Sequence, residues 1–187
     1  MRVLVSGGAG YIGSHTVVQL VAAGHEVLVV DSFANAKPAV VGRLETLTGA
    51  AIPVHAFDLT DHEKTERLFA QEPIDAVVHF AGLKAVGESV QRPLDYYENN
   101  LESTFSLVRA MRRHGCGLLV FSSSATVYGD HAPVPYVEDY EPLSASSPYG
   151  RTKVMIEQVL RDVAHIDEGL RVALLRYFNP VGAHPSG

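Results

Sequence analysis

The sequence predicts an α/β fold in which a doubly wound parallel sheet carries helices on both faces. Two observations lead to this prediction. First, six apolar runs of strand length alternate along the 187 residues with segments of helical character. Second, these runs are apolar on successive residues, as expected of strands that are buried on both faces. Five strand–helix units and a sixth strand fit one domain over residues 1–187.

The expected elements follow in order. The strands lie at Val3–Val5, Val27–Val30, Val54–Phe57, Ala76–Phe80, Leu118–Phe121 and Val172–Leu175. The helices run from Tyr11 to Gly24, Pro38 to Gly49, Thr60 to Pro73, Pro93 to Gly115 and Pro148 to about Asp167. Proline at helix starts and glycine after helix ends is the usual asymmetry, and Thr60–Glu63 has the pattern of a capping box. The stretches Gly82–Arg92 and Ser123–Ser147 are expected to be irregular loops after strands, where open α/β sheets bind ligands.

Composition narrows the functional class. A net charge of −6 gives no support to nucleic-acid binding, which needs a basic surface, and the cluster Arg109, Arg112 and Arg113 suits the solvated end of a helix. Cys116 is the single cysteine, so no internal disulfide forms and a reducing compartment is expected. No apolar run has the length of a signal peptide or membrane span, and the nine histidines show no zinc-ligand spacing. We expect a cytoplasmic protein without a structural metal, a nucleic-acid partner or a membrane.

The first strand leads into a glycine-rich turn. Gly7, Gly10 and Gly13 precede a helix, and Asp31 ends the second strand. Glycines allow a tight turn and let a pyrophosphate approach the N–H groups at a helix N-terminus. A carboxylate after the second strand accepts hydrogen bonds from ribose hydroxyls and repels a 2′-phosphate. In this context the pattern predicts a Rossmann-type dinucleotide site with NAD rather than NADP, although Lys37 nearby would favour a phosphate. A plain tight turn is the alternative.

A tyrosine and a lysine follow the fifth strand. Of eight tyrosines, only Tyr149 has a lysine four residues later, Lys153, and this spacing places both on one face of a helix. A neighbouring ammonium and the positive nicotinamide ring of the cofactor are expected to lower the pKa of the phenol, and Lys153 is expected to reach the cofactor ribose. By itself the pair also fits a solvent-facing contact. Ser124, in the run Ser122–Ser124 after the fifth strand, adds a hydroxyl at the same edge of the sheet. Together with the glycine turn, these residues predict a Ser/Tyr/Lys oxidoreductase site.

Five runs resemble the UDP-glucose 4-epimerases, which are extended short-chain dehydrogenases. They are Gly7–His15 (GGAGYIGSH), His79–Val90 (HFAGLKAVGESV), Phe121–Gly129 (FSSSATVYG), Ser147–Lys153 (SPYGRTK) and Leu174–Gly187 (LLRYFNPVGAHPSG). The resemblance covers the whole chain. A complete member continues through a C-terminal UDP-sugar-binding domain, so we expect residues 1–187 to be the N-terminal, NAD-binding part, with that substrate domain absent.

The resemblance implies which residues bind ligands. For the cofactor they are Gly7, Gly10, Tyr11, Ile12, Gly13, Asp31, Ser32, Phe33, Ala34, Asn35, Ala36, Asp58, Leu59, Phe80, Ala81, Gly82, Leu83, Lys84, Asn99, Ser124, Tyr149, Lys153 and Phe178. For the substrate they are Lys84, Ser124, Tyr149, Phe178 and Asn179. Ala36 stands where a serine is expected, which removes one hydroxyl contact. Without the resemblance, Asn99 fits a polar helix residue and Phe178 fits core packing.

The mechanism that the resemblance implies is reversible oxidation at C4 of UDP-glucose and UDP-galactose, with Tyr149 as base and NAD tightly bound. A 4,6-dehydratase or decarboxylase is the nearest alternative, but Ala125 and Thr126 replace the acidic residue that a dehydratase needs. A non-catalytic NAD-binding module is the other alternative, and residues 1–187 alone are expected to show only trace activity. His79 is expected to be a buried core histidine and Cys116 to be unreactive. Apolar residues on the helices after Pro93 and Pro148, as in related enzymes, predict a homodimer: Leu101, Phe105, Val108, Val154, Ile156, Val159 and Leu160.

Overall fold

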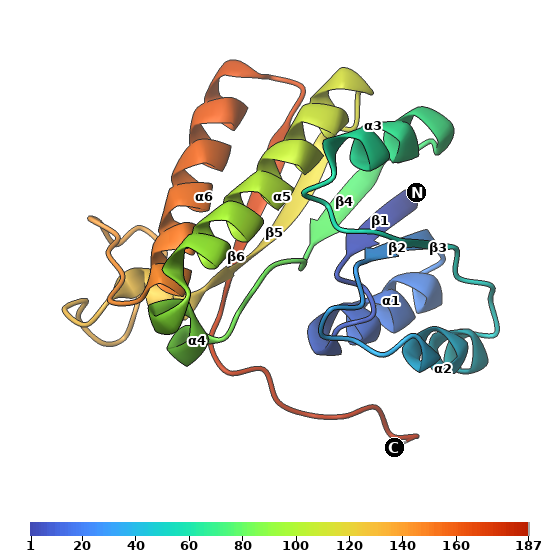
Figure 1. The fold of residues 1–187 in the computed structure, drawn as a ribbon, viewed down its shortest axis with the longest axis horizontal. Helices are drawn as coiled ribbons and strands as arrows, with labels where there is room; N and C mark the ends of the chain where they lie inside the picture. Colours follow the sequence, from blue (N-terminus) through green and yellow to red (C-terminus); the bar gives the residue numbers. More distant parts are fainter. Residues whose placement is uncertain (187) are drawn as a thin grey trace.

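The computed structural model describes residues 1–186, so Gly187, the last residue of the C-terminal run, lies outside the described part. Six strands form one parallel sheet in the order β3-β2-β1-β4-β5-β6 (Figure 1). Their bounds are β1 Arg2–Ser6, β2 Glu26–Asp31, β3 Val54–Ala56, β4 Ala76–His79, β5 Leu118–Ser124 and β6 Arg171–Tyr177. The predicted doubly wound parallel sheet is confirmed.

Helices connect the strands as the alternation of apolar runs and helical segments predicted. They are α1 Tyr11–Ala22, α2 Ala39–Thr48, α3 His62–Gln71, α4 Val86–Gln91, α5 Pro93–Arg113 and α6 Pro148–Ile166, with a short 3₁₀ helix, η1, at Ala125–Tyr128. The prediction that 82–92 is irregular is therefore wrong over α4. The six residues of α4 are too few to show a helical period, and they include Gly87, which is a poor helix former.

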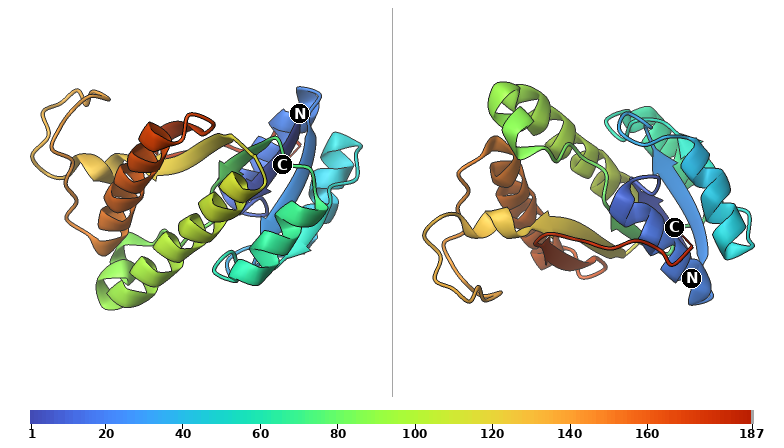
Figure 2. Two further views of the ribbon diagram at one scale, coloured as in Figure 1. Left: turned by 90° about the horizontal axis from the view of Figure 1, so that it is seen from above. Right: turned by 90° about the horizontal axis from the view of Figure 1, so that it is seen from below.

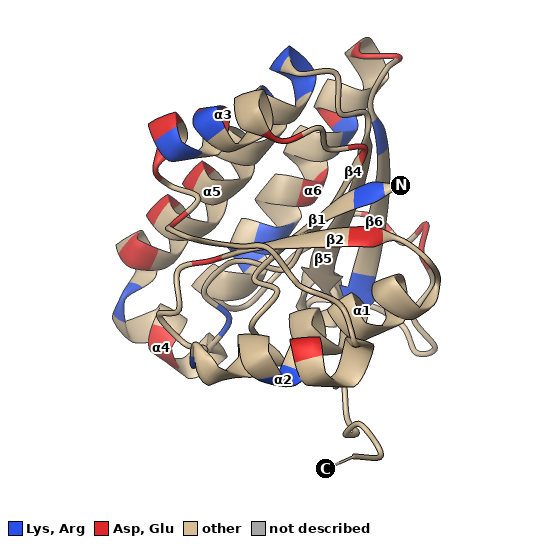
Figure 3. Cartoon of the chain, turned by 90° about the vertical axis from the view of Figure 1, so that its right-hand side faces the viewer, with Lys and Arg blue, Asp and Glu red and all other residues tan. Residues whose placement is uncertain are grey.

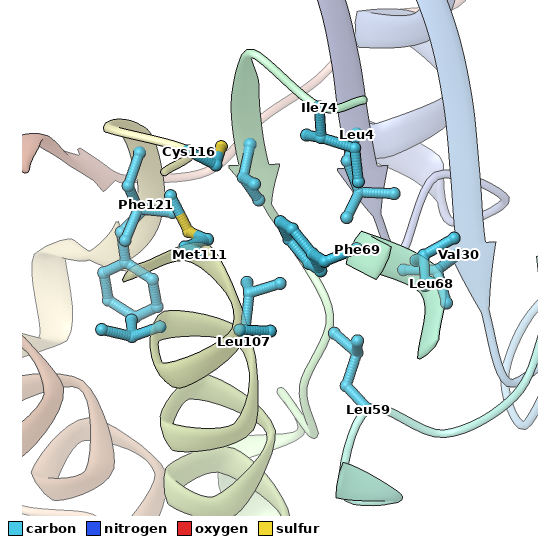
Figure 4. Close-up of a cluster of buried hydrophobic side chains, with 14 of the residues drawn as sticks. Leu4, Val30, Leu59, Leu68, Phe69, Ile74, Leu107, Met111, Cys116 and Phe121 are labelled. Carbon is cyan, nitrogen blue, oxygen red and sulfur yellow. The ribbon is translucent and has the colours of Figure 1, made fainter. Parts of the chain in front are cut away.

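Two apolar clusters fill the two sides of the sheet. On one side, Val17 of α1 and Leu44 of α2 pack on alternate valines of β1 and β2, such as Val3 and Val29. On the other side, α3, α5 and α6 cover residues of β1, β4 and β5, and Figure 4 shows Phe69 of α3 among these side chains. Figure 2 shows α5 and α6 lying together, apart from α1 and α2. The strand β6 lies at the edge of the sheet, where its residues alternate between exposed and partly buried.

Two local predictions need correction. The N-cap of α3 is Asp61, whose Oδ1 accepts a hydrogen bond from Lys64 N at 3.1 Å, so Thr60–Glu63 is not a capping box. Asp and Thr both serve as N-caps, and the hydrogen-bond geometry decides between them. The strand β5 continues to Ser124, so the three serines lie within the strand and not in a turn after it.

Charged residues of both signs alternate over the outer surface of α3 and α5 (Figure 3). The three arginines at the end of α5 each have a carboxylate partner: Arg109 pairs with Glu102, Arg112 with Asp167 and Arg113 with Glu66. Among the described residues, no helix combines the length and the apolar character needed to cross a bilayer.

Candidate active site

The glycine turn between β1 and α1 needs its glycines for steric reasons. Gly7 has a positive φ of +69°, and a Cβ there would lie 2.8 Å from Ala81 N. A Cβ at Gly13 would collide with the carbonyl oxygen of Gly7. The turn closes on itself through a hydrogen bond of 3.0 Å from Gly10 N to Gly7 O. The first turn of α1 is therefore held directly against the end of β1, and its N-terminus faces the carboxyl edge of the sheet.

Asp31 at the end of β2 braces this turn. Its Oδ2 accepts a hydrogen bond from Ala9 N at 3.0 Å, and its Oδ1 accepts one from Phe33 N at 2.9 Å. Each carboxylate oxygen can accept a further hydrogen bond. Asp31 is partly exposed, so it has a structural role toward the turn and retains acceptor capacity toward a ribose.

A cavity of about 260 Å³ lies against the glycine turn. It is lined by Ala9, Gly10, Tyr11 and Ser14 from the turn and α1, and by Asn35, Ala36, Lys37, Ala39, Val40 and Arg43. The predicted contact residues Asn35 and Ala36 border this cavity, as do the cationic side chains Lys37 and Arg43. The charge and the small residues at the helix N-terminus suit an anionic ligand such as a pyrophosphate.

The loop after β4 passes the glycine turn and is fixed by Asn100 of α5. The buried amide of Asn100 accepts a hydrogen bond from Leu83 N at 2.7 Å and donates to Leu83 O at 3.0 Å. It also donates to Thr152 Oγ1 of α6 at 3.1 Å. The predicted neighbour Asn99 is partly exposed, whereas Lys84 is exposed. Asn100 thus joins the loop that was predicted to wrap the cofactor to the helix that carries Tyr149.

Ser124, Tyr149 and Lys153 meet at the carboxyl edge of the sheet. The helix α6 begins at Pro148 with Ser147 as its N-cap, and the Ser147 side chain accepts from Gly150 N at 3.1 Å. The hydroxyl of Ser124 lies beside the phenol of Tyr149, close enough to lower the pKa of that phenol. Lys153 Nζ lies 5.8 Å from the centroid of the Tyr149 ring and donates to Ser122 O at 2.8 Å. The structure therefore brings the predicted serine, tyrosine and lysine together.

Burial dominates the ionisation of this group. Burial raises the pKa of Tyr149, and the hydrogen bond from Ser124 only partly opposes it. Lys153 is not among the causes that shift this pKa, because its ammonium is directed at Ser122 O, and the predicted effect of the nicotinamide ring stays a prediction. Burial also lowers the pKa of Lys153 to about 8. At neutral pH, Lys153 is therefore a cation close to its titration range, and Tyr149 is a neutral phenol.

The predictions for His79 and Cys116 are confirmed. His79 is 1% exposed, and its ring lies 2.6 Å from Ser6 Oγ and 3.1 Å from Thr104 Oγ1. Because Thr104 Oγ1 donates to Asn100 O, Nε2 of His79 is the donor in its contact with Thr104. Burial lowers the pKa of His79 to about 3, and burial raises that of the Cys116 thiol. Both residues are core residues.

The chain after β6 crosses the carboxyl edge of the sheet toward the glycine turn (Figure 1). Tyr11 Oη donates to Gly182 O at 2.5 Å, which connects this segment to α1. Phe178 is 63% exposed and stacks on Tyr136 with ring centroids 5.9 Å apart, so the core-packing alternative for Phe178 is wrong. Asn179 beside it is also exposed.

The remaining predicted contact residues lie around the same edge with varied exposure. Asp58 is exposed and accepts hydrogen bonds from Thr60. The side chain of Leu59 is 3% exposed and lies in the core, so only the backbone of Leu59 is free to contact a ligand. Ser32, Ala34 and Asn35 are exposed; Ile12, Phe33, Ala36, Phe80, Ala81, Gly82 and Leu83 are partly buried. Among residues 1–186, no group of His, Cys, Asp and Glu is arranged to hold a metal ion.

Three further polar residues at the site were not predicted from the sequence. Asn100, Thr152 and Glu157 are buried and hydrogen-bonded to segments that are distant in the sequence. A polar residue on the buried face of an amphipathic helix is the signal that could have found them, since such a group requires a partner.

The model of the NAD dependent epimerase/dehydratase family matches residues 3–187. The chain belongs to this family. It is 54% identical over 187 residues to the UDP-glucose 4-epimerase of Yersinia pestis, and equally identical to that of Bacillus subtilis strain 168. The match covers 100% of this chain and 55% of each of these relatives. The chain therefore spans about half the length of the curated relatives that it matches.

Solved structures give the same result. The UDP-glucose 4-epimerase of Bifidobacterium longum in complex with NAD+ and UDP matches with a TM-score of 0.97 at 47% identity, over 100% of this chain and 56% of that one. The enzyme of Stenotrophomonas maltophila, with bound NAD and formylated UDP-arabinopyranose, matches with a TM-score of 0.95 at 49% identity, over 100% of this chain and 55% of that one. The predicted Rossmann-type fold and epimerase-family resemblance are confirmed.

Proposed function

We propose that the protein interconverts UDP-glucose and UDP-galactose by NAD-dependent epimerisation at C4 of the sugar, as an enzyme of galactose metabolism. One observation carries the proposal: Ser124, Tyr149 and Lys153 are assembled at the carboxyl edge of the sheet, the edge on which the glycine turn after β1 also lies. This is the edge where open α/β sheets bind ligands. The similarity to UDP-glucose 4-epimerases selects this reaction among those of the family.

The cofactor proposal fits the residues that are present. The glycine turn offers N–H groups to a pyrophosphate, and Lys37 and Arg43 add positive charge beside the cavity. Asp31 retains acceptor capacity for ribose hydroxyls. The loop from Phe80 to Lys84 borders the turn at Ala81 and is held by Asn100. NAD bound there would supply the acceptor and donor of the hydride that is exchanged with C4 of the sugar.

Tyr149 is the proposed general base. Its phenol takes the proton of the sugar 4-hydroxyl as C4 is oxidised to a ketone, and it returns the proton when C4 is reduced from the opposite face. Ser124 donates a hydrogen bond that stabilises the phenolate over the phenol. Lys153, one turn along α6, is placed to reach the cofactor ribose from the same side. Phe178 and Asn179 are placed to contact the sugar nucleotide.

The position after Ser124 argues against a dehydratase. Elimination of water needs an acid–base group here, and Ala125 and Thr126 provide none. Thr126 is engaged with Ser124: its N–H and its hydroxyl both donate to Ser124 Oγ, at 3.2 and 3.0 Å. This threonine therefore orients the serine.

The test uses full-length protein that continues beyond residue 187, in a coupled assay for UDP-glucose formed from UDP-galactose. Tyr149→Phe is expected to lower turnover roughly 10²–10⁴-fold, the contribution of a general base, while NAD remains bound. Tyr140→Phe, at a tyrosine away from α6, is the matched control. Near-normal turnover by Tyr149→Phe would refute the assignment of the base.

Residues 1–187 alone are proposed to show at most trace turnover in the same assay. The chain spans 55% of its relatives, and binding energy from the remote nucleotide helps to orient the reacting sugar. Substantial turnover by this chain, with its mass verified, would mean that the sugar nucleotide site is misplaced.

We also propose a C₂ homodimer through α5 and α6. Of the seven apolar residues predicted for the interface, Val108, Ile156 and Leu160 are buried within the monomer and are excluded. Leu101, Phe105, Val154 and Val159 are only partly buried, and Met155 is 48% and Leu94 70% exposed on the same two helices. Sedimentation at micromolar concentration is expected to show a dimer that Met155→Glu weakens.

The proposed location is the cytoplasm, since a reducing compartment suits the lone Cys116.

A further inference from the structure

Three successive serines of β5 contact three residues on one face of α6. Tyr149, Lys153 and Glu157 follow one another at intervals of four residues, so they lie in a row along the helix. Tyr149 lies beside the Ser124 side chain, which lowers the pKa of its phenol, and Lys153 Nζ donates to Ser122 O at 2.8 Å. The third contact is between Ser123 Oγ, which donates, and Glu157 Oε1, at 2.5 Å. The first two members of the row belong to the proposed chemistry, whereas the third has no role in it.

Glu157 is a fully buried carboxylate with partners on three sides. Besides Ser123, it accepts from Arg176 Nε at 3.1 Å and from Arg176 Nη2 at 2.8 Å, in a two-pronged ion pair. Arg161 Nη2, from a side chain that is 47% exposed, approaches it at 3.5 Å. Burial alone would raise the pKa of Glu157, but the hydrogen bonds from Arg176 and Ser123 outweigh this and hold it below its ordinary value. Glu157 is therefore an anion that connects α6, β5 and β6.

Arg176 extends this connection to the loop after β5. It is paired in register with Ser123 across β5 and β6, and its guanidinium lies 4.8 Å from the centroid of the Tyr128 ring. Its Nη1 donates to Glu138 O at 3.1 Å. Tyr128 in turn stacks on Tyr136. The loop that leads to Tyr149 is thus anchored, through Arg176, to the same carboxylate that holds α6.

We propose that Glu157 is a positioning residue. It fixes the position of α6 along β5, so that the Tyr149 phenol lies beside the Ser124 hydroxyl. The role of Tyr149 as the base rests on the proposed function, but the positioning claim concerns only the Tyr149–Ser124 contact. A sliding or tilting of α6 would break all three serine contacts together, because the three side chains project from one rigid helix. Glu157 is the member of the row with the most hydrogen bonds and the least exposure.

The experiment measures the ionisation of Tyr149 itself. Carbon-13 NMR of tyrosine labelled at Cζ follows each phenol through pH, and the Tyr149 signal is assigned by its loss in Tyr149→Phe. The test variant is Ser123→Ala, which removes the β5 contact and leaves the Glu157–Arg176 ion pair in place. Glu157→Gln is the second variant. Arg161→Gln, at a half-exposed arginine that approaches Glu157 from within α6 and does not contact β5, is the matched control. Circular dichroism confirms the fold of each variant at each pH.

In Ser123→Ala and in folded Glu157→Gln, the titration midpoint of the Tyr149 phenol is expected to rise by roughly half a pH unit to one pH unit. This is the effect of losing one hydrogen bond to the phenolate. Arg161→Gln is expected to leave the midpoint unchanged. A residue that only stabilised the fold would lower the melting temperature without moving this midpoint. An unchanged midpoint in Ser123→Ala, whether or not Glu157→Gln folds, would overturn the proposal. Since no sugar nucleotide is present, failure of the epimerase assignment leaves this result untouched.

Discussion

Removing the buried cation of Lys153 is expected to change how stability depends on pH. The side chain is 6% exposed, and its burial lowers its pKa from 10.5 to about 8. Between these two values the unfolded chain binds a proton that the folded chain has released. Stability therefore rises with pH across this window, since the unfolded state binds more protons. At pH 7 both states are protonated, and the full cost of burying the cation is present.

The magnitude follows from the two pKa values. Between pH 7 and pH 10, the wild-type chain is expected to gain about 2.5 kcal/mol of unfolding free energy from this one group, as an order of magnitude. Lys153→Met, of similar length and without charge, loses this term. The difference in stability between variant and wild type should accordingly shift by that amount, in favour of wild type, as the pH rises.

The assay is urea denaturation of residues 1–187 without added cofactor, at intervals between pH 7 and pH 10. Other buried groups titrate in this range, but they are common to both proteins and cancel in the difference. Lys37→Met, at an exposed lysine, is the control, and its difference from wild type is expected to stay constant. If the Lys153→Met difference is equally constant, the ammonium is solvated in solution, and the buried Lys153–Ser122 contact is wrong.

Three further predictions concern the cofactor turn and its support. NAD(H) is expected to bind more tightly than NADP(H), by on the order of 1–3 kcal/mol, because Asp31 would face a 2′-phosphate; equal affinities in a calorimetric titration would contradict this. Gly13→Ala is expected to lower the unfolding free energy by about 1–3 kcal/mol and to weaken NAD binding, because the added methyl group collides with Gly7 O. The control is Gly87→Ala, where the added methyl group has no atom within 4 Å. Between pH 7 and pH 5, wild type is expected to lose about 2 kcal/mol more unfolding free energy than His79→Gln. The reason is that His79, with a pKa of about 3 in the folded chain, is neutral there and takes up a proton on unfolding. Parallel curves of unfolding free energy against pH for the two proteins would count against the burial of His79.

The sequence predicted those parts of the molecule that depend on local order. Val27–Val30 is apolar on successive residues, and it forms a central strand covered on both sides. The interval from Tyr149 to Lys153 is a property of one helix, so their common face followed from spacing alone. The short helix Val86–Gln91 was missed because its stability comes from what it packs against.

The pKa of Tyr149 shows where reasoning from neighbours in the sequence fails. Proximity to Lys153 along the helix predicted a lowered value, yet the ammonium turns to Ser122 O and burial raises the value instead. Both effects depend on β5, which is more than 20 residues away along the chain. Burial and the choice of hydrogen-bond partner are properties of the packed structure.

The same distinction applies to the polar residues beneath the site. Asn100, Glu157 and Arg176 each make contacts across at least two elements, and none has a characteristic spacing to its partners. Each is nevertheless a buried polar group that must be paired, since an unpaired one would cost more than its hydrogen bonds contribute. Their partners are the loop at Leu83, the serine before Ser124 and the loop at Glu138. The obligatory pairing of these buried groups therefore fixes the loops and the helix that carry the proposed chemistry.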